Sequence, residues 1–509
     1  MCGVVGLTGA PGAAREAFLG LTTLQHRGQD AAGILSHDSA GFHRVRNIGL
    51  VESVFNRDNM EGLTGDTAIG HARYSTIGRG DLSEVQPFLM SYPFGLGMVH
   101  NGNIVNHREI AHDLKVRAKR HLLTHSDTEV VLNLFADSLS RTVGEFDVEQ
   151  EDLPFDSICK AIGEIYTKLS GSYSIVTLIG DQGLLAFRDP HGIRPLIWGK
   201  RSGGSLPSGE AHMIASESAP LFFLGYEKVR DLQPGEVLYI DRHGKVHSRV
   251  IDGREARPCM FEWVYFASPE SDIDNVPVYG ARINLGRSLA RLVKDAMKDR
   301  GFQPDLIVPV PETSRIAAIS LAEDLGIPYR ELLIKNRYIK RTFILDSQEK
   351  RQKAVNLKLS PVRSEIEGKK IMLVDDSIVR GTTSKKIIDL VRRAGAKEVY
   401  FVSTCPPIRT PCFYGIDFPD PAELIASGRD LGEIEKELGA DVVIYQDMKG
   451  LVESVTPPGS GKRPCTACLD GKYPTDVSAG LRFTAERNQD RNRQSESAAG
   501  SSKKERSGT

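Results

Sequence analysis

Apolar residues follow two different spacings along the chain, and the change falls near residue 304. In the first 230 residues, short β-like apolar runs alternate with glycines and with segments of helical spacing. The apolar runs are residues 3–7, 68–71, 97–100, 172–179, 183–187 and 213–215, and the helical segments are 108–114 and 128–138. Val131, Leu134 and Phe135 share one face of the second helical segment. Ser126 or Asp127 can cap its start, and strands combined with helices predict a layered α+β domain.

From about Pro304 onward, strands and helices alternate. Residues 305–310, 371–374 and 398–402 are short apolar runs of the kind that forms buried strands. Between them, segments 317–325 and 387–394 carry apolar residues at helical spacing. Each is followed by a glycine, Gly326 or Gly395, where helices commonly end. This βαβ order predicts an α/β domain with a parallel sheet covered by helices.

Length and composition limit the class of protein. A chain of 509 residues exceeds what one hydrophobic core usually covers, and we expect domains at 2–235 and 260–450, a C-terminal segment at 451–485 and a disordered tail at 486–509. The net charge of −1 predicts no bulk attraction to nucleic acid or to anionic membranes. No apolar run approaches the roughly 18 residues of a membrane span, and no signal peptide is recognisable. We therefore expect a cytoplasmic protein.

The stretch from Lys369 to Thr383 is the sharpest local motif. A buried strand ends in Asp375 and Asp376, at the sheet edge where parallel sheets bind ligands. Gly381 permits a tight turn, after which backbone N–H groups and threonine hydroxyls open a helix whose N-terminus favours an anion. The two carboxylates suit sugar hydroxyls or Mg²⁺. The alternative is a solvated acidic turn that only caps the helix.

Positive charge is dense between the first two strands of this half. It runs from Lys335 to Ile344 and continues at Lys350, Arg351 and Lys353. A solvated face and a nucleic-acid patch are alternatives, but beside a loop that favours an anion a basic lid that orders on binding fits better. Residues 311–314, at the end of the neighbouring strand, are expected to face the same anion.

Cys2 is the second residue of the chain. We expect removal of Met1, which would leave Cys2 with both a thiol and a free α-amine. An α-amine has a pKa near 7.7–8.0 and can accept a proton at neutral pH. Nucleophile and general base would then share one residue. Alone, a cysteine at this position is equally a chance event.

Four further residues suit an amide substrate. The Asn101 side chain and the Gly102 backbone N–H can stabilise the oxyanion that forms when a thiolate attacks an amide. Arg73 can bind an amino acid's carboxylate, and Asp127 its ammonium. Each alone also fits an ordinary turn or a surface charge.

Together these motifs resemble two known families. Residues 371–383 resemble the phosphoribosyl-pyrophosphate loop of type I phosphoribosyltransferases. That resemblance implies that Asp375 and Asp376 hold the ribose hydroxyls and, with Thr313, Mg²⁺. The implied 5-phosphoribosyl diphosphate contacts are Ser377, Val379, Arg380, Gly381, Thr382, Thr383 and Lys335. Cys2, Arg73, Asn101, Gly102 and Asp127 resemble the glutaminase site of class II glutamine amidotransferases, which implies the four-layer αββα fold of N-terminal-nucleophile hydrolases.

Over residues 2–475 the chain resembles the glutamine phosphoribosylpyrophosphate amidotransferases. The resemblance implies that ammonia freed from glutamine at Cys2 displaces pyrophosphate at ribose C1, giving 5-phosphoribosylamine for purine synthesis. It also implies feedback inhibition by purine nucleotides and a homotetramer. After Phe266-Ala267, however, many relatives have Arg-Pro-Asp-Ser where this chain has Ser268-Pro269-Glu270-Ser271, which puts a role for that arginine in doubt.

The seven cysteines do not fit a secreted disulfide framework. Spacing makes Cys465 and Cys468 metal-ligand candidates in a loop, with a redox pair as the alternative. The resemblance implies a [4Fe–4S] cluster held by Cys259, Cys412, Cys465 and Cys468. A four-cysteine Zn²⁺ site, Cys405 as a substitute ligand, and four unligated thiols are the alternatives.

Two other functions compete with this interpretation. One is a different class II glutaminase that makes a sugar amine or an amino-acid amide, which the Asp375-Asp376 loop argues against. The other is a nucleotide-sensing regulator that keeps the phosphoribosyl fold for binding only. Such a regulator would not need Cys2, Arg73, Asn101 or Asp127.

Overall fold

The computed structural model describes residues 2–74, 81–147, 151–335, 359–418, 420–457 and 463–486. Contacts divide the chain into two compact units. Unit 1 comprises Met1–Pro258, Pro411–Asp420 and Tyr473–Thr509, and unit 2 comprises Cys259–Thr410 and Pro421–Lys472. Among the described residues, 411–418 and 473–486 therefore pack with unit 1, although each stretch follows a stretch of unit 2 in the chain. Of the tail expected at 486–509, all but Glu486 lies outside the described residues.

Unit 1 contains two antiparallel sheets. The first has the order β11–β9–β10–β1–β4–β2–β3, formed by Glu227–Asp231, Ile197–Ser202, Glu210–Ala215, Gly3–Thr8, Thr67–Arg73, Ala31–Asp38 and Gly41–Ile48. The second has the order β13–β12–β8–β7–β6–β5, formed by Val246–Val250, Glu236–Asp241, Gly183–Arg188, Gly171–Ile179, Leu96–Ile104 and Phe88–Met90.

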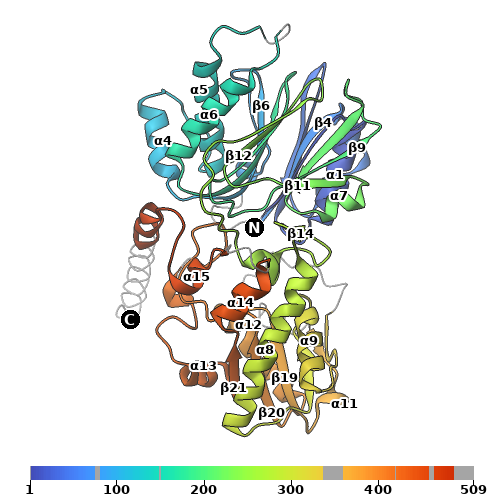
Figure 1. The fold of residues 1–509 in the computed structure, drawn as a ribbon, viewed down its shortest axis with the longest axis vertical. Helices are drawn as coiled ribbons and strands as arrows, with labels where there is room; N and C mark the ends of the chain where they lie inside the picture. The colour runs from blue at the N-terminus through green and yellow to red at the C-terminus, as the bar shows by residue number, and fades with distance from the viewer. Residues whose placement is uncertain are drawn as a thin grey trace, which may run out of the picture. The chain divides into compact units, whose positions relative to one another are not determined.

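Helices cover the outer face of each sheet (Figure 1). The main ones are α1 (Ala13–Thr23) and α7 (Ala219–Phe223) on the first sheet, and α4 (His107–Val116), α5 (Asp127–Val143) and α6 (Phe155–Lys168) on the second. Short helical turns lie at α2 (Val51–Val54), α3 (Arg57–Glu61) and η1 (Leu82–Glu84).

Alternation along β6 explains why two apolar layers form. Val99 packs between the two sheets, in the same cluster as Val4 and Val176. Met98, one residue earlier, points the opposite way and packs with Phe135 in the helix layer. The expected four-layer αββα arrangement is confirmed.

Helix α5 begins at Asp127, one residue before the expected segment and after Ser126, one of the two predicted caps, but it runs to Val143 and so ends five residues later than the apolar pattern indicated. Its last turns have no continuous apolar face. Arg141 pairs there with Asp137 one turn earlier, at 3.3 Å, which supports the helix without burial.

Unit 2 is built on a parallel four-stranded sheet, as expected. The order is β16–β19–β20–β21, formed by Leu306–Pro309, Lys370–Asp375, Glu398–Ser403 and Val442–Tyr445. One face packs against α8 (Val278–Arg300) and α9 (Arg315–Leu325) through residues such as Met372, and the other against α12 (Thr382–Arg393) and α13 (Leu431–Leu438) through residues such as Leu373. Helix α9 stops at Gly326 with φ of 66°, which confirms the predicted helix end.

Smaller elements complete unit 2. They are the π-helical turn η2 (Glu262–Phe266), β14 (Asp272–Ile273), β15 (Val276–Pro277), β17 (Leu333–Lys335), β18 (Leu359–Pro361), α11 (Arg363–Ile366), η3 (Pro421–Glu423), α14 (Met448–Val455) and α15 (Ala467–Asp470). No helix in the described part of the chain is long and apolar enough to cross a membrane.

Candidate active sites

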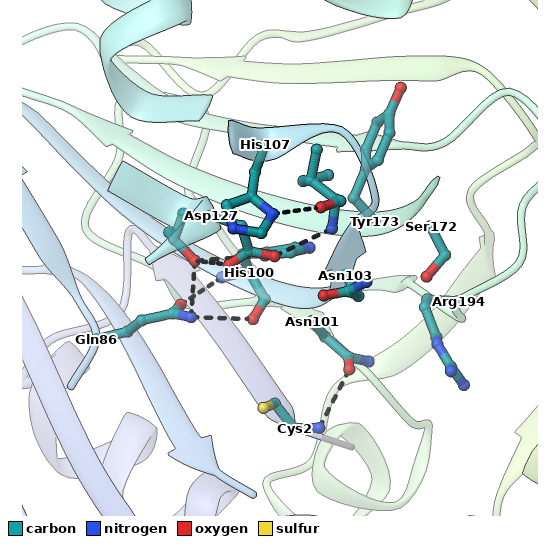
Figure 2. A network of polar contacts seen from close by, with 12 residues as sticks. Cys2, Gln86, His100, Asn101, Asn103, His107, Asp127, Ser172, Tyr173 and Arg194 are labelled. Carbon is teal, nitrogen blue, oxygen red and sulfur yellow. Dashed lines mark hydrogen bonds and ion pairs between the residues drawn. The ribbon is translucent and has the colours of Figure 1, made fainter. Parts of the chain in front are cut away.

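Cys2 lies immediately before β1, a central strand of the first sheet of unit 1. Its backbone nitrogen donates a hydrogen bond to Asn101 Oδ1 at 3.2 Å (Figure 2). Its carbonyl accepts a bond from Arg27 Nε at 3.2 Å, and its Sγ lies 3.9 Å from the carbonyl oxygen of Tyr74. Hydrogen bonds at the backbone nitrogen and at the carbonyl of Cys2 therefore fix the position of the backbone from which the thiol side chain extends.

Asn101 and Gly102 are consecutive residues of β6. Asn101 Oδ1 is occupied by Cys2, while its buried Nδ2 makes no hydrogen bond with the part of the chain that the structure describes. Gly102 has φ of 151°, and a Cβ there would lie 2.0 Å from the carbonyl oxygen of Ser172. Only glycine fits, and the stretch offers one unused amide donor beside the Cys2 backbone.

Asp127 opens α5 and faces the same region. Its Oδ2 accepts a bond from the Ile104 backbone N–H at 3.1 Å and lies 3.7 Å from His100 Nδ1. Burial alone would raise the pKa of Asp127, but His100 outweighs it and holds that pKa well below its usual range. Burial alone would lower the pKa of His100, but Asp127 outweighs it and raises that pKa. Asp127 is therefore an ionised carboxylate, suited to an ammonium group.

Arg73 ends β4 and is buried. Its guanidinium pairs with Glu84, at 2.8 Å between Nη2 and Oε2. The pair orients the guanidinium within the site. A guanidinium has five N–H donors, so Arg73 can bind a carboxylate while it remains paired with Glu84.

These residues come together around one cavity in unit 1. Its volume is about 520 Å³, and Cys2, Arg73, Gly102 and Asp127 all line it. A ring of basic side chains forms other parts of the wall: His107, Arg108, His112, Lys115, Arg120, His121 and His125. The structure thus brings four residues that are far apart in sequence to one concave site, beside Asn101.

A buried ion pair supports the Cys2 backbone from the opposite direction. Arg27, which bonds to the Cys2 carbonyl, also pairs with Glu217, and both side chains are fully buried. His26 adds a second contact to Glu217 at 2.8 Å. Burial alone would raise the pKa of Glu217, but Arg27 and His26 lower it to about 2. Sequence reasoning did not assign Arg27, Glu217, His100 or Glu84, because their partners are recognisable only once the strands are paired.

In unit 2, Asp375 is the last residue of β19, and Asp376 follows it. Asp375 Oδ1 accepts from the Asp376 backbone N–H at 3.0 Å, and Asp376 Oδ1 accepts from Ser377 Oγ at 2.8 Å. Burial raises the pKa of both carboxyls, and the neighbouring charge of Asp376 raises the pKa of Asp375 further. The hydrogen bond from Ser377 and the charge of Arg282 oppose this rise for Asp376. Such a pair gains stability from a cation.

The loop after the two aspartates turns at Gly381, with φ of 72°, into α12. A Cβ on Gly381 would lie 2.4 Å from Ile425 Cδ1, so the tight turn excludes a side chain. Ile425 also anchors the loop, because its N–H donates to the Val379 carbonyl at 2.9 Å. Arg380 pairs with Glu423 at 2.7 Å. Thr382 and Thr383 form the first turn of α12, where N–H groups favour an anion.

Thr313 lies in the turn that follows β16, and β16 is parallel to β19 and adjacent to it. The turn is therefore at the same sheet edge as Asp375. Lys335 ends β17, and its Nζ is 3.9 Å from Glu312 Oε1. The rest of the predicted basic lid, residues 336–358, lies outside the described residues.

The candidate cluster cysteines are free of disulfides. In unit 2, Cys259 and Cys465 pair in an isolated parallel β-bridge, and both are buried, as is Cys468. Cys468 lies in the short helix α15 rather than in the loop that the sequence indicated, because a single turn of helix forms after Thr466. Cys412 belongs to unit 1. Within the described residues, no group of three or more His, Cys, Asp or Glu side chains is arranged to hold a metal ion.

Comparisons with known proteins cover both units. Residues 71–222 match a family model described as a glutamine amidotransferase domain, and residues 281–411 match one described as a phosphoribosyl transferase domain. The chain is 44% identical to the amidophosphoribosyltransferase of Escherichia coli, over 89% of this chain and 88% of that one. It is 40% identical to the same enzyme of Methanocaldococcus jannaschii, over 94% and 98%.

Solved structures agree with these sequence relatives. The fold is similar to that of the glutamine phosphoribosylpyrophosphate amidotransferase of B. subtilis complexed with ADP and GMP. The TM-score is 0.80 at 37% identity, and the match covers 94% of this chain and 98% of that chain. With two site-bearing folds in one chain and relatives of this similarity along nearly its whole length, the chain belongs to the amidophosphoribosyltransferase family.

Proposed function

We propose that this protein makes 5-phosphoribosylamine in two half-reactions. Unit 1 hydrolyses glutamine to glutamate and ammonia, and unit 2 transfers the phosphoribosyl group of 5-phosphoribosyl diphosphate to that ammonia, releasing diphosphate. The observation that carries the proposal is the cavity of unit 1, where Cys2, Arg73, Gly102 and Asp127 meet beside the unused amide donor of Asn101. A regulator that only binds nucleotides has no use for such a site.

Each residue of unit 1 has a role in this proposal. Once Met1 is removed, the Cys2 α-amine takes the thiol proton and the thiolate attacks the glutamine amide carbon. Asn101 Nδ2 and the Gly102 N–H stabilise the oxyanion. Arg73 binds the glutamine carboxylate and Asp127 its ammonium, so that the side-chain amide is presented to the thiolate. The C–N bond then breaks, and the ammonia leaves with the proton that the α-amine held. The glutamyl group remains on Cys2 as a thioester, which water hydrolyses to release glutamate and restore the thiol.

The loop of unit 2 binds the second substrate. Asp375 and Asp376 hold the ribose hydroxyls. Ser377, Val379, Arg380, Gly381, Thr382 and Thr383 wrap the 5′-phosphate, and Lys335 contacts the diphosphate. Asp375, Asp376 and Thr313 would hold Mg²⁺, and two carboxylates with substrate oxygens form a donor set that this ion prefers. Bound Mg²⁺ would neutralise charge on the leaving diphosphate.

Four cysteines would hold a [4Fe–4S] cluster, namely Cys259, Cys412, Cys465 and Cys468. The thiol donor set suits such a cluster, and three of the four thiols are buried within unit 2. Cys405 and Cys159 have no assigned role. Purine-nucleotide inhibition, a homotetramer and a cytoplasmic location complete the proposal. The ADP and GMP complexed with the B. subtilis enzyme support the first of these.

The deciding experiment measures glutamate and diphosphate release with and without 5-phosphoribosyl diphosphate. We expect the sugar substrate to stimulate glutamine hydrolysis and the two products to form in equal amounts. Cys2→Ala should abolish glutamine use and leave amination by free ammonia. Loss of both activities would make Cys2 structural, and glutaminase activity that ignores the sugar substrate would remove the proposed function.

The cluster has a separate test that does not depend on activity. Anaerobically purified protein should contain about four iron atoms per chain and absorb near 400 nm. Cys412→Ser should lower both values, whereas Cys159→Ser, in α6 of unit 1, should change neither. Zinc in place of iron would favour the four-cysteine Zn²⁺ site instead.

A further inference from the structure

Residues 411–418 follow the phosphoribosyl transferase match in the chain but pack within unit 1. Tyr473 Oη donates to the Pro411 carbonyl at 2.7 Å, and the Cys412 N–H donates to the Phe418 carbonyl at 3.0 Å. The segment is therefore a closed turn tied to the glutaminase unit. Nothing in the proposed chemistry uses it apart from Cys412.

Three side chains of the glutaminase unit bind two consecutive carbonyls of this turn. Asn103 Nδ2 donates to the Phe413 carbonyl at 2.9 Å. Ser172 Oγ donates to the Tyr414 carbonyl at 3.1 Å. Arg194 donates to the same oxygen through Nε, at 2.9 Å, and through a second guanidinium nitrogen. Because Asn103 and Ser172 are directly paired between β6 and β7, the turn is bound to the strand pair that carries Asn101 and Gly102.

The next residue of the turn, Gly415, lies against Gly102 itself. A Cβ on Gly415 would be 3.0 Å from the Gly102 carbonyl oxygen and 3.2 Å from its carbon. Gly102 is also in close contact with Ser172, whose carbonyl oxygen excludes a Cβ there. The Gly102 backbone is thus confined between the paired strand and the turn.

Arg194 is suited to hold this arrangement rigidly. Its side chain is fully buried. Its own carbonyl accepts from Ser174 Oγ at 2.9 Å and from Arg188 Nε at 2.6 Å. Figure 2 shows Arg194 and Ser172 in the same region as Asn101 and Asn103. A charged donor that binds a buried carbonyl in a fixed geometry is stronger than a neutral one.

We propose that Arg194 is a positioning residue for glutamine hydrolysis: through the Tyr414 carbonyl it holds Gly415 against Gly102 and so keeps the oxyanion-binding backbone in place. The inference rests on the proposed function, since it assumes that the Asn101–Gly102 stretch stabilises an oxyanion. It makes the turn at 411–418 a part of the glutaminase machinery, although it is about 310 residues away from that stretch in sequence.

The expected consequence is a loss in kcat with little change in KM. Substrate is held by Arg73 and Asp127, which the turn does not contact through any of these hydrogen bonds. The oxyanion exists only in the transition state, so a displaced donor lowers kcat. A displacement of about 1 Å can cost about 10²-fold in rate. We expect glutamine-dependent kcat to fall between about 10-fold and 10²-fold in Arg194→Met, with KM for glutamine within about threefold of the parent.

Gly415→Ala is the sharper variant, because its added carbon would press on Gly102. Gly415 has φ of 92°, so alanine also adds backbone strain. Gly225→Ala is the matched control: Gly225 is in the same unit with φ of 74° and nothing within 4 Å of an added Cβ. Gly415→Ala should lower glutamine-dependent kcat at least about tenfold more than Gly225→Ala. Amination by free ammonia should stay within about twofold in both, since unit 2 is unaltered.

A double variant tests whether the two residues act through one turn. Arg194→Met combined with Gly415→Ala should lose much less than the product of the single losses. Arg194→Lys, which keeps the charge but not the fork, should recover part of kcat. Should Arg194→Met fail to fold, Gly415→Ala and Ser172→Ala decide on their own.

Three outcomes would overturn the inference: unchanged kcat in Gly415→Ala and Ser172→Ala, a change confined to KM, or equal loss of the ammonia-dependent reaction. Cys2→Ala separates this result from a failure of the proposed function. If Cys2→Ala abolishes glutamine use while Gly415→Ala keeps full kcat, only the positioning role is wrong.

Discussion

The carboxylates of the two candidate sites are shifted in opposite directions. In unit 1 the pKa values of Asp127 and Glu217 are lowered, although both groups are largely buried, because cationic or protonatable partners outweigh burial. In unit 2 the pKa values of Asp375 and Asp376 are raised, because both carboxyls are buried and Asp375 also lies beside the charge of Asp376. The glutaminase site is therefore electrostatically satisfied by its own residues, and the phosphoribosyl loop is not.

This difference explains how each site depends on what binds it. A site whose charges are already paired keeps its geometry before the substrate arrives, as catalysis by fixed dipoles requires. A site with two buried carboxyls whose pKa values are raised lowers the stability of its unit at neutral pH until a cation or a hydrogen-bonding ligand binds. We therefore expect binding to stabilise unit 2 more than unit 1, and four substitutions test the contrast.

Asp375→Asn should give the largest loss of activity and, unlike most substitutions in a site, a gain in stability. Loss of a carboxylate from the proposed ribose and Mg²⁺ site should lower amination by both glutamine and free ammonia about 10²–10³-fold. The pKa of Asp375 is raised in the folded unit, so the folded state binds a proton that the unfolded chain has released, and stability falls as pH rises between the two pKa values. Asparagine removes that cost, and Tm at neutral pH should rise by about 2–4 °C.

Asp389→Asn, an exposed residue of α12, is the control for Asp375→Asn and should change neither activity nor Tm. Initial rates with each nitrogen source and a thermal unfolding scan without ligands measure both quantities. A fall in Tm for Asp375→Asn would break the proposed contrast, since it would mean that the carboxylate is stabilising in the ligand-free unit.

Glu217→Gln should cause the next largest change, this time in stability. Its pKa is lowered from 4.5 to about 2, which corresponds to about 3 kcal/mol at neutral pH. Because the folded-state pKa is below the unfolded one, this stabilisation is present above about pH 4.5 and is lost as the pH falls toward 2. The glutamine variant also leaves Arg27 buried without its carboxylate.

Urea unfolding between pH 3 and 7 measures this effect. The parent should lose stability on acidification, and Glu217→Gln should be less stable at pH 7 and depend less on pH. Glu61→Gln is the control, because Arg57 and Glu61 form an exposed pair worth about 0–1 kcal/mol. Equal losses in the two variants would show that the buried pair is not specially stabilising.

Asp127→Asn should act on substrate binding and shift stability in the sense opposite to Asp375→Asn. Loss of the ammonium partner should lower kcat/KM for glutamine about 10–10²-fold while sparing the reaction with ammonia. The lowered pKa of Asp127 means that its ionised form stabilises the folded unit above its unfolded pKa, so Tm at pH 7 should fall. Asp113→Asn, on the exposed face of α4, should have neither effect. A rise in Tm for Asp127→Asn would remove the difference between the two sites.

How much of this could be predicted from the sequence depended on how local each feature is. The phosphoribosyl loop was predictable because the strand, both aspartates and Gly381 lie within twelve residues of each other. The pair β2 and β3 was not recognised, since Ala31-Ala32-Gly33 has weak β-propensity and is stabilised by its neighbours in the sheet.

In the glutaminase site, too, the local features were predictable and the long-range contacts were not. Cys2, Arg73, Asn101 and Asp127 were predicted by resemblance, but the partners that hold them were not. Arg73 and Glu84 are 11 residues apart, Arg27 and Glu217 are 190 apart, and Arg194 and Tyr414 are 220 apart. No spacing rule connects such pairs. They depend on strand pairing and on which unit a turn packs against, and only the folded chain specifies both.

Arg380→Gln should give the smallest effect and sharpens the contrast within unit 2. Arg380 is in the phosphate loop, but its guanidinium is about 39% exposed and pairs with Glu423, which is about as exposed. Such a pair contributes little to stability, so Tm should change by less than about 2 °C. If Arg380 binds the 5′-phosphate, KM for 5-phosphoribosyl diphosphate should rise several-fold, and more at low salt than at high salt. The control is Lys385→Gln. Lys385, on α12, forms an exposed pair with Glu437, on α13, and its loss should leave KM unchanged. Equal KM changes in the two variants would mean that the loop attracts the substrate by general charge rather than through Arg380. A rise confined to Arg380→Gln would show that the phosphate contact is already in position before the substrate binds, although the pKa values of the neighbouring carboxyls are raised in the ligand-free unit.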